Sequence, residues 1–243
     1  MIETSRLCRS FGPIRAVEDL DLRVDAGEIF GFLGPNGAGK TTTIRMLCGL
    51  LEPTSGTLAI DGHDYRSAGS RIRQITALAP DTPPLYDYLS GWQYVAFVAG
   101  LYGIAADDRD RDGRRNLERL GLIDRADELC KGYSHGMRKK LHLAAVLTTR
   151  PRLLILDEPT TGLDPASVRT LKDMLSDARA EGVTVFLSTH VLSTAEEICD
   201  RVGILYEGRL RAEGSLSALR KDGLDTLEDV FLDLTENEAD ASS

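Results

Sequence analysis

Residues Gly34 to Thr41 read GPNGAGKT, and the fold of the chain follows from where this run stands. The apolar residues Ile29 to Leu33 precede it and predict a buried strand, while the stretch from Thr42 to Leu51 predicts a helix. A glycine turn between a strand and a helix directs backbone N–H groups and the positive end of the helix dipole toward one point. Such a P-loop suits a polyphosphate, because glycine lets the backbone approach oxygen atoms that a Cβ would block.

The side chains of this run add the charge and the metal ligand that a nucleotide needs. Lys40 supplies a cation for the β- and γ-phosphates, and the Thr41 hydroxyl is placed to ligate Mg²⁺. The residues predicted to contact the nucleotide here are Gly34, Pro35, Asn36, Gly37, Ala38, Gly39, Lys40, Thr41 and Thr42.

A second sequence element, a buried strand followed by two carboxylates, predicts that the bound nucleotide is hydrolysed. The run from Leu153 to Leu156 is unbroken and apolar, as in a central parallel strand, and Asp157 and Glu158 follow it. Two adjacent carboxylates at such a strand end are costly to bury without a cation, which argues against a purely structural role. We predict that Asp157 binds Mg²⁺ and that Glu158 polarises the attacking water.

Between these elements, Tyr133 to Leu141 reads YSHGMRKKL. With this run the chain resembles the ABC ATPase family, the nucleotide-binding subunits of ABC transporters, over nearly its whole length. The family signature is usually Leu-Ser-Gly-Gly-Gln, of which Ser134 and Gly136 keep the phosphate-contacting positions. The other three positions differ as they commonly do in the drug-exporter-like branch. Ser134 is equally well suited to be the ordinary N-cap of a helix that ends near Thr149.

The resemblance assigns further roles. It implies that the nucleotide is ATP, with Phe11 stacked on the adenine and His190, after the apolar strand Val183 to Ser188, in contact with the γ-phosphate. Asp164, in Gly162-Leu163-Asp164, matches a loop that crosses the dimer interface.

One position departs from the family. After the predicted strand Ile75 to Ala79, the family usually places a glutamine after a proline, where it senses Mg²⁺ and the attacking water. This chain has Pro80 followed by Asp81, whose charged side chain has a shorter reach. We predict that Asp81 takes the sensing role, acting on the metal through an extra water.

Composition sets limits on the partners. Of 243 residues, 42% are hydrophobic, and no apolar run reaches the ~20 residues that span a bilayer. The net charge is −9; the segment from Asp222 onward holds eight acidic residues and no Lys or Arg, which leaves −1 for the body. A near-neutral body without a basic stripe gives little support for nucleic-acid binding. The four cysteines lack metal or redox spacing, which suits a reducing cytosol.

The chain divides along its length as the family does. We expect a single domain over 1–235, in which 1–81 and 151–221 form a RecA-like α/β P-loop NTPase core with an antiparallel β-subdomain. Residues 82–150 are predicted to form an inserted α-helical subdomain. Residues 222–235 are predicted to form an acidic amphipathic helix that docks on the body, because Leu227, Val230, Phe231 and Leu234 recur at helical spacing. We expect residues 236–243 to be a frayed tail.

Two stretches of the helical subdomain are informative. The charged run from Asp107 to Arg115 is interpreted as a solvated helix start or loop. Aromatic residues follow the Asp81 loop, and they suit either a docking cleft for another protein or a helical core. These aromatic residues are Tyr86, Tyr88, Trp92 and Tyr94.

The function predicted from these features is ATP hydrolysis in an ABC transporter, with an exporter favoured. The resemblance implies a head-to-tail dimer with itself or a second ABC subunit, in which Lys40 of one subunit and Ser134 and Gly136 of the other enclose ATP. It also implies a separate transmembrane permease as partner and a peripheral position on the cytoplasmic side of the membrane. The alternative is a soluble ABC ATPase that acts as an assembly factor of the iron–sulfur cluster type. A nucleic-acid-acting ABC protein is disfavoured, because the chain has neither a second cassette nor a long coiled coil.

Overall fold

The P-loop follows a buried central strand. In the computed structural model, which describes residues 1–220 and 226–241, strand β3 (Ile29–Leu33) leads into helix α1 (Lys40–Leu47), and every residue of β3 is buried. Helix α1 begins two residues before the predicted start at Thr42 and ends before Leu51. It ends early because Gly49, with φ of 64°, takes the left-handed conformation that closes many helices.

Five parallel strands bring their carboxyl ends to one edge of the main sheet. The strand order is β10-β9-β3-β8-β7-β6, and only β10 runs antiparallel to its neighbour. The remaining strands of this sheet are β6 (Thr76–Ala79), β7 (Leu153–Asp157), β8 (Thr184–Thr189), β9 (Arg201–Tyr206) and β10 (Arg209–Ser215). The loops that follow β3, β6, β7 and β8 therefore meet at one edge, where ligands bind in open α/β sheets.

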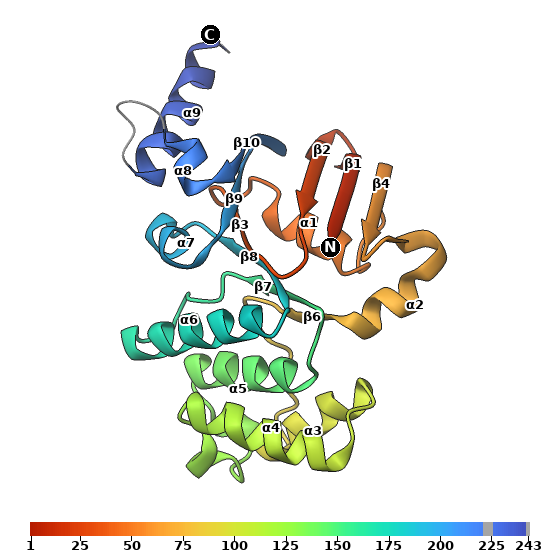
Figure 1. Ribbon diagram of the computed structural model, residues 1–243, viewed down its shortest axis with the longest axis vertical. Helices are drawn as coiled ribbons and strands as arrows, with labels where there is room; N and C mark the ends of the chain where they lie inside the picture. Colours follow the sequence, from red (N-terminus) through yellow and green to blue (C-terminus); the bar gives the residue numbers. More distant parts are fainter. Residues whose placement is uncertain (221–225, 242–243) are drawn as a thin grey trace.

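A second, antiparallel sheet lies beside the first (Figure 1). Its order is β2-β1-β4-β5, built from β1 (Ile2–Phe11), β2 (Ile14–Val24), β4 (Ser55–Ile60) and β5 (His63–Asp64). Side chains of both sheets share one core with α1, in which the stacked rings of Phe30 and Phe186 lie 5.8 Å apart between centroids. This antiparallel layer was predicted from the sequence.

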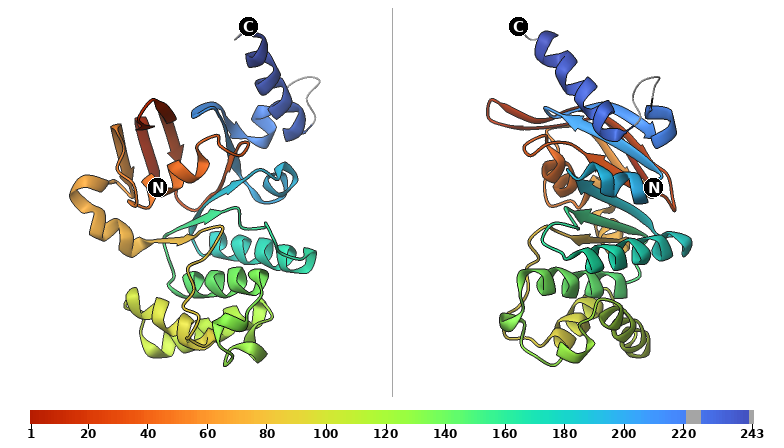
Figure 2. Two further views of the ribbon diagram at one scale, coloured as in Figure 1. Left: turned by 180° about the vertical axis from the view of Figure 1, so that it is seen from behind. Right: turned by 90° about the vertical axis from the view of Figure 1, so that its left-hand side faces the viewer.

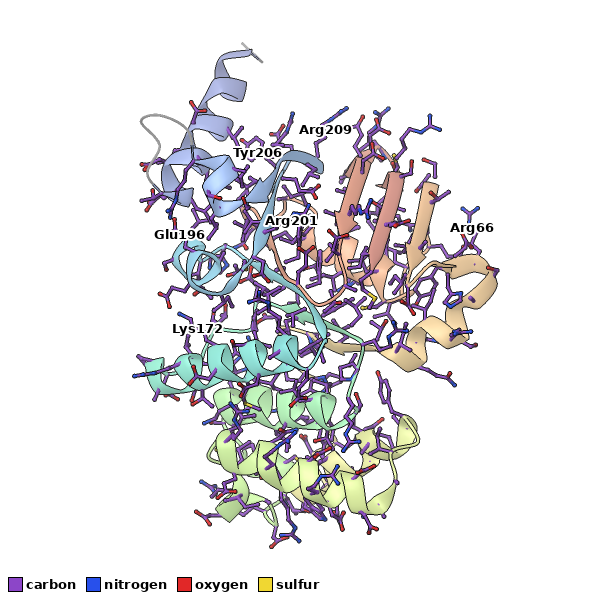
Figure 3. The ribbon with its side chains drawn as sticks, viewed as in Figure 1. Arg66, Lys172, Glu196, Arg201, Tyr206 and Arg209 are labelled. Carbon is purple, nitrogen blue, oxygen red and sulfur yellow. The ribbon has the colours of Figure 1, made fainter. Side chains whose placement is uncertain are left out.

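An ion-pair cluster joins three neighbouring strands at one side of the main sheet. Arg201 on β9 (Figure 3) lies 3.0 Å from a carboxylate oxygen of Glu28, just before β3, and also pairs with Glu213 on β10.

The segment between residues 82 and 150 is helical, as the sequence predicts, and lies at the opposite end of the molecule from the carboxyl terminus (Figure 2). Its elements are α3 (Gly91–Leu101), α4 (Ala106–Arg119), η1 (Ile123–Arg125), η2 (Cys130–Gly132) and α5 (His135–Thr148). Helix α5 packs on α3 and α4 and also contacts β6, so it joins the helical segment to the main sheet.

The remaining helices pack on strands of the two sheets or on one another. They are α2 (Tyr65–Ile75), α6 (Pro165–Ala180), α7 (Leu192–Ile198), α8 (Leu216–Leu219) and α9 (Leu227–Ala241). None of the helices within the described residues is long and apolar enough to cross a membrane.

The last helix docks on the body through its apolar face, as its residue spacing predicts. Leu227 and Val230 are buried, and Glu196 of α7 (Figure 3) accepts a hydrogen bond of 2.7 Å from the Leu227 amide. Two boundaries differ from the prediction. Helix α9 begins at Leu227 rather than at 222, although 222–225 lie outside the described residues, and it continues to Ala241 where we expected a frayed tail. The tail has neither glycine nor proline to stop the helix, and its Glu and Ala residues favour it.

Candidate functional site

The P-loop is a backbone cradle that only glycine can form. Gly37 and Gly39 have φ of 85° and 108°, in the left-handed region. A Cβ on Gly39 would lie 2.3 Å from the Ala16 carbonyl oxygen, and one on Gly34 would lie 2.3 Å from that of Leu205. The first N–H groups of α1 then face the loop, because a helix start leaves them without partners in the helix.

Lys40 brings a buried positive charge to this cradle. Its side chain is 6% exposed, and its ammonium donates hydrogen bonds to the carbonyl oxygens of Gly34 at 2.7 Å and Pro35 at 3.1 Å. The same nitrogen lies 3.6 Å from Glu158 Oε1. An ammonium with three donors is therefore fixed between the P-loop and the end of β7, where it can bind phosphate oxygens.

Thr41 and Asp157 meet beside this lysine, although 116 residues separate them in the sequence. The Thr41 hydroxyl donates to Asp157 Oδ2 at 3.1 Å, and Asp157 Oδ1 accepts from the Ser188 hydroxyl of β8. Sequence reasoning missed Ser188; the signal for it is a polar residue near the end of the strand adjacent to β7. Oxygen ligands from a hydroxyl and a carboxylate fit Mg²⁺, which usually takes one or two protein ligands and completes its shell with phosphates and water.

The two carboxylate oxygens of Glu158 have different surroundings, because one has a side-chain partner and the other has no hydrogen bond within the described residues. His190 Nδ1 lies 2.9 Å from Glu158 Oε2, whereas Oε1 is buried and has no hydrogen-bond partner among the described residues. The residue also has φ of 48°, an unusual conformation for glutamate that concentrates at functional sites. A buried carboxylate oxygen without a donor can accept a proton from a water molecule.

These side chains surround an open pocket of about 300 Å³. Its lining residues are Ala16, Pro35, Asn36, Gly37, Gly39, Lys40, Thr41, Thr42, Asp81, Asp157 and Glu158. Six predicted nucleotide contacts are not among them: Phe11, Gly34, Ala38, Ser134, Gly136 and Asp164. Within one chain, the structure thus brings together the P-loop, both carboxylates and Asp81, while the signature segment lies outside the pocket.

The family described as "ABC transporter" matches residues 17–161, which include the P-loop, the signature run and both carboxylates. The chain belongs to the ABC transporter family. It is an ABC ATPase, because this family's domain binds and hydrolyses ATP in transporter subunits.

Relatives and a solved structure agree with this assignment. The daunorubicin/doxorubicin resistance ATP-binding protein DrrA of Streptomyces peucetius is 41% identical over 90% of this chain, which spans 66% of that protein's length. The bacitracin transport ATP-binding protein BcrA of Bacillus licheniformis is 37% identical over 91% of this chain and 72% of its own length. A structure of an ATP-binding subunit of an ABC transporter matches with a TM-score of 0.92 at 33% identity, covering 97% of this chain and 99% of that chain. The predicted fold class is thereby confirmed. The alternative of a soluble assembly factor is not favoured.

The signature run of this ABC ATPase forms a helix start. Ser134 is the N-cap of α5, and its hydroxyl accepts from the Met137 amide at 3.3 Å. A Cβ on Gly136 would lie 3.1 Å from the carbonyl oxygen of Gly162, so the signature packs closely against the loop after β7. The N-cap predicted for Ser134 is present, and its contact with a phosphate stays a prediction.

Two other predicted contacts have partners within the chain. Asp164 is the N-cap of α6 and accepts from the Ser167 hydroxyl at 2.6 Å and amide at 2.9 Å; these hydrogen bonds lower the pKa of Asp164 below its ordinary value. Phe11 is 45% exposed, and the Arg9 guanidinium lies 4.5 Å from its ring centroid. Their roles toward ATP stay predictions.

Asp81 lines the pocket but also has a partner that the sequence did not reveal. Its Oδ1 lies 2.6 Å from the ammonium of Lys139 on α5, and its side chain is 48% exposed. The carboxylate therefore lies between the nucleotide pocket and the signature helix.

Proposed function

We propose that this ABC ATPase hydrolyses Mg²⁺-ATP at two sites in a head-to-tail dimer and so drives a separate permease that exports its substrate. The dimer is supported by one observation: on a single chain, the predicted ATP contacts fall into two separate groups. The P-loop and both carboxylates line one pocket, while the exposed helix start at Ser134 lies outside it on the same chain. A second subunit would supply its own Ser134 and Gly136 to complete the pocket, because a helix N-terminus attracts phosphate.

Each side chain has a task that its contacts support. The P-loop amides and Lys40 would bind the phosphates, with Phe11 against the adenine. Thr41 and Asp157 would hold Mg²⁺, which would neutralise charge on the β- and γ-phosphates. Glu158 Oε1 would accept the proton of the attacking water, while His190 fixes the other carboxylate oxygen. Asp81 would sense the metal and this water, and Asp164 would lie where the two subunits meet.

A permease partner is supported by the aromatic residues near Asp81. Tyr86, Tyr88 and Phe97 are 56%, 82% and 40% exposed, and the rings of Tyr86 and Phe97 meet edge to face at 5.2 Å. Tyr94, by contrast, is buried in the helical core. The buried Tyr94 fits the interpretation as a helical core, and the exposed rings would suit a protein partner on the cytoplasmic side of the membrane. The export direction rests on the relatives, which include proteins named for drug resistance and bacitracin transport.

The dimer is tested with Glu158→Gln, which should trap ATP without hydrolysing it. Light scattering with saturating Mg²⁺-ATP should give twice the monomer mass. The matched control adds Ser134→Arg to Glu158→Gln and should stay monomeric while still binding ATP. A monomer in both samples would contradict the proposal.

The permease is tested by coexpression with a neighbouring gene product, chosen because it has about six hydrophobic segments of ~20 residues. The ABC ATPase should sediment with membranes only when that protein is present. Joint replacement of Tyr86 and Phe97 by alanine should return it to the supernatant, whereas Leu232→Ala, an exposed residue of α9, should not. A wild-type chain that stays in the supernatant would count against a permease partner of this kind.

A further inference from the structure

Lys139 is a buried lysine in the middle of the signature run. Its side chain is 6% exposed, although lysine is almost never buried unless it is paired. Its ammonium donates to Asp81 Oδ1 at 2.6 Å, to the Glu158 carbonyl oxygen at 3.0 Å and to the Thr161 carbonyl oxygen at 2.9 Å. All three donors of the ammonium are therefore used.

The three acceptors belong to three different parts of the site. Asp81 follows β6 and lines the nucleotide pocket, Glu158 is the proposed base after β7, and Thr161 lies in the loop that leads to Asp164. Lys139 itself stands on α5, the helix whose first residues follow Ser134. One ammonium thus joins the pocket to the helix that would face the second subunit.

The backbone of Glu158 needs such support. Its φ of 48° is a conformation that persists only where the surroundings fix it. The Glu158 amide donates to the Ser188 carbonyl oxygen at 3.1 Å, and its carbonyl oxygen accepts from Lys139. The Thr161 amide donates to the same carbonyl oxygen at 3.3 Å, so loss of the Lys139 contact would leave this oxygen with only the longer of its two hydrogen bonds.

We propose that Lys139 is a positioning residue for ATP hydrolysis, which fixes the Glu158 backbone and orients the Asp81 carboxylate toward the nucleotide pocket. This inference rests on the proposed role of Glu158 as the base. It also explains the acid at position 81. A buried ammonium needs a counter-charge, which the glutamine usual in the family lacks, so Asp81 and Lys139 form a matched pair.

The test compares Lys139→Met, which keeps most of the length of the side chain and removes the ammonium, with Lys139→Gln, which keeps two neutral donors. The control is Lys140→Met, the next residue on the same helix. For each purified chain, kcat for ATP, the Kd of a fluorescent ATP analogue with Mg²⁺, and the unfolding temperature are measured. We expect kcat of Lys139→Met to fall about 10-fold to 100-fold while Kd changes less than about threefold, because positioning of the base affects the transition state and not ATP binding. Lys139→Gln should fall between Lys139→Met and wild type, and it serves alone if Lys139→Met does not fold.

A double-mutant cycle with Asp81→Asn separates positioning from mere stability. If Lys139 acts partly through Asp81, the two losses in kcat will not multiply, and the double mutant will retain at least about threefold more activity than their product predicts. Three results would overturn the inference. The losses in kcat of the two single variants could multiply in the double mutant, both Lys139 variants could keep the wild-type kcat, or Lys139→Met and Lys140→Met could lose kcat equally. If Glu158→Gln hydrolyses ATP at a near-normal rate, Glu158 is not the base, and the inference about Lys139 fails with it. If Glu158→Gln is inactive while Lys139→Met is fully active, only the inference about Lys139 is wrong.

Discussion

His190 Nδ1 lies 2.9 Å from Glu158 Oε2, so the side chains of the two residues that directly follow the neighbouring strands β8 and β7 are in contact. The contact leaves Glu158 Oε1 as the oxygen that faces Lys40, at 3.6 Å. One carboxylate oxygen thus contacts His190, and the other is the oxygen that we propose accepts the proton of the attacking water.

The first prediction follows from this division. Glu158→Gln keeps the shape of the side chain but cannot accept a proton as a carboxylate does. ATP affinity should stay nearly unchanged, while turnover should fall by a factor on the order of 10²–10⁴. Equilibrium ATP binding checks the predicted affinity, and steady-state hydrolysis checks the predicted fall in turnover. Near-normal turnover would mean that another group activates the water.

A second prediction concerns Asp81. Asp81→Ala removes both the charge beside Lys139 and the group that faces the pocket, so ATP hydrolysis should fall. Asp81→Gln supplies an oxygen that can still accept from Lys139 and has a longer reach, so it should retain more activity than Asp81→Ala. Hydrolysis rates over a Mg²⁺ titration distinguish the variants. Equal rates in all three proteins would place the sensing role elsewhere.

A third prediction links pH to stability through His142 on α5. Its Nε2 lies 3.0 Å from the Leu78 carbonyl oxygen and must donate to it, so Nδ1 accepts from the Tyr94 hydroxyl at 2.6 Å. Burial lowers the pKa of His142 below its ordinary value. The unfolded chain therefore takes up a proton on His142 at a higher pH than the folded chain does. The contribution of neutral His142 to stability is lost as pH falls through the unfolded pKa of ~6.5.

The measurement compares the free energy of unfolding of wild type and His142→Gln between pH 8 and pH 5. The advantage of wild type should shrink on acidification, by at most about 1.4 kcal/mol per pH unit, because one proton is involved. Other titrating groups are common to both proteins and cancel in the difference. A pH-independent difference would show that His142 has the same pKa in the folded and unfolded chains.

The nucleotide pocket could be predicted because parallel strands impose it. Once Ile29 to Leu33 and Leu153 to Leu156 are recognised as buried parallel strands of one sheet, their carboxyl ends must reach the same edge of that sheet. Thr41 and Asp157 then meet without any knowledge of the loops between them. Local sequence patterns are sufficient here, since the strand direction supplies the long-range information.

The polar contacts of the helical segment could not be predicted in this way. The run Asp107 to Arg115 is a helix start, as one sequence interpretation expects, because it forms the first part of α4. It is not fully solvated, since the side chain of Asp112 is only 3% exposed and lies 2.6 Å from the Arg150 guanidinium. Lys139 likewise stands in a charged run and is buried. Both burials depend on a partner dozens of residues away, and a charge pattern alone does not specify that partner.

The last prediction tests whether each site is shared between two chains. Lys40→Ala should be inactive because the phosphate cradle loses its cation, and Ser134→Arg should be inactive because bulk and charge block the opposing helix start. In a mixed dimer, one site combines both lesions, while the other pairs an intact P-loop with an intact signature.

Mixing the two inactive proteins under conditions that allow subunit exchange should therefore restore ATP hydrolysis, provided that one intact site can turn over without its twin. Wild type mixed with each variant is the control for exchange and for that independence. Purified heterodimers that stay inactive while both control mixtures hydrolyse ATP would contradict the shared site. A site built within one chain requires that inactivity, because every subunit of the mixture would then carry its own lesion.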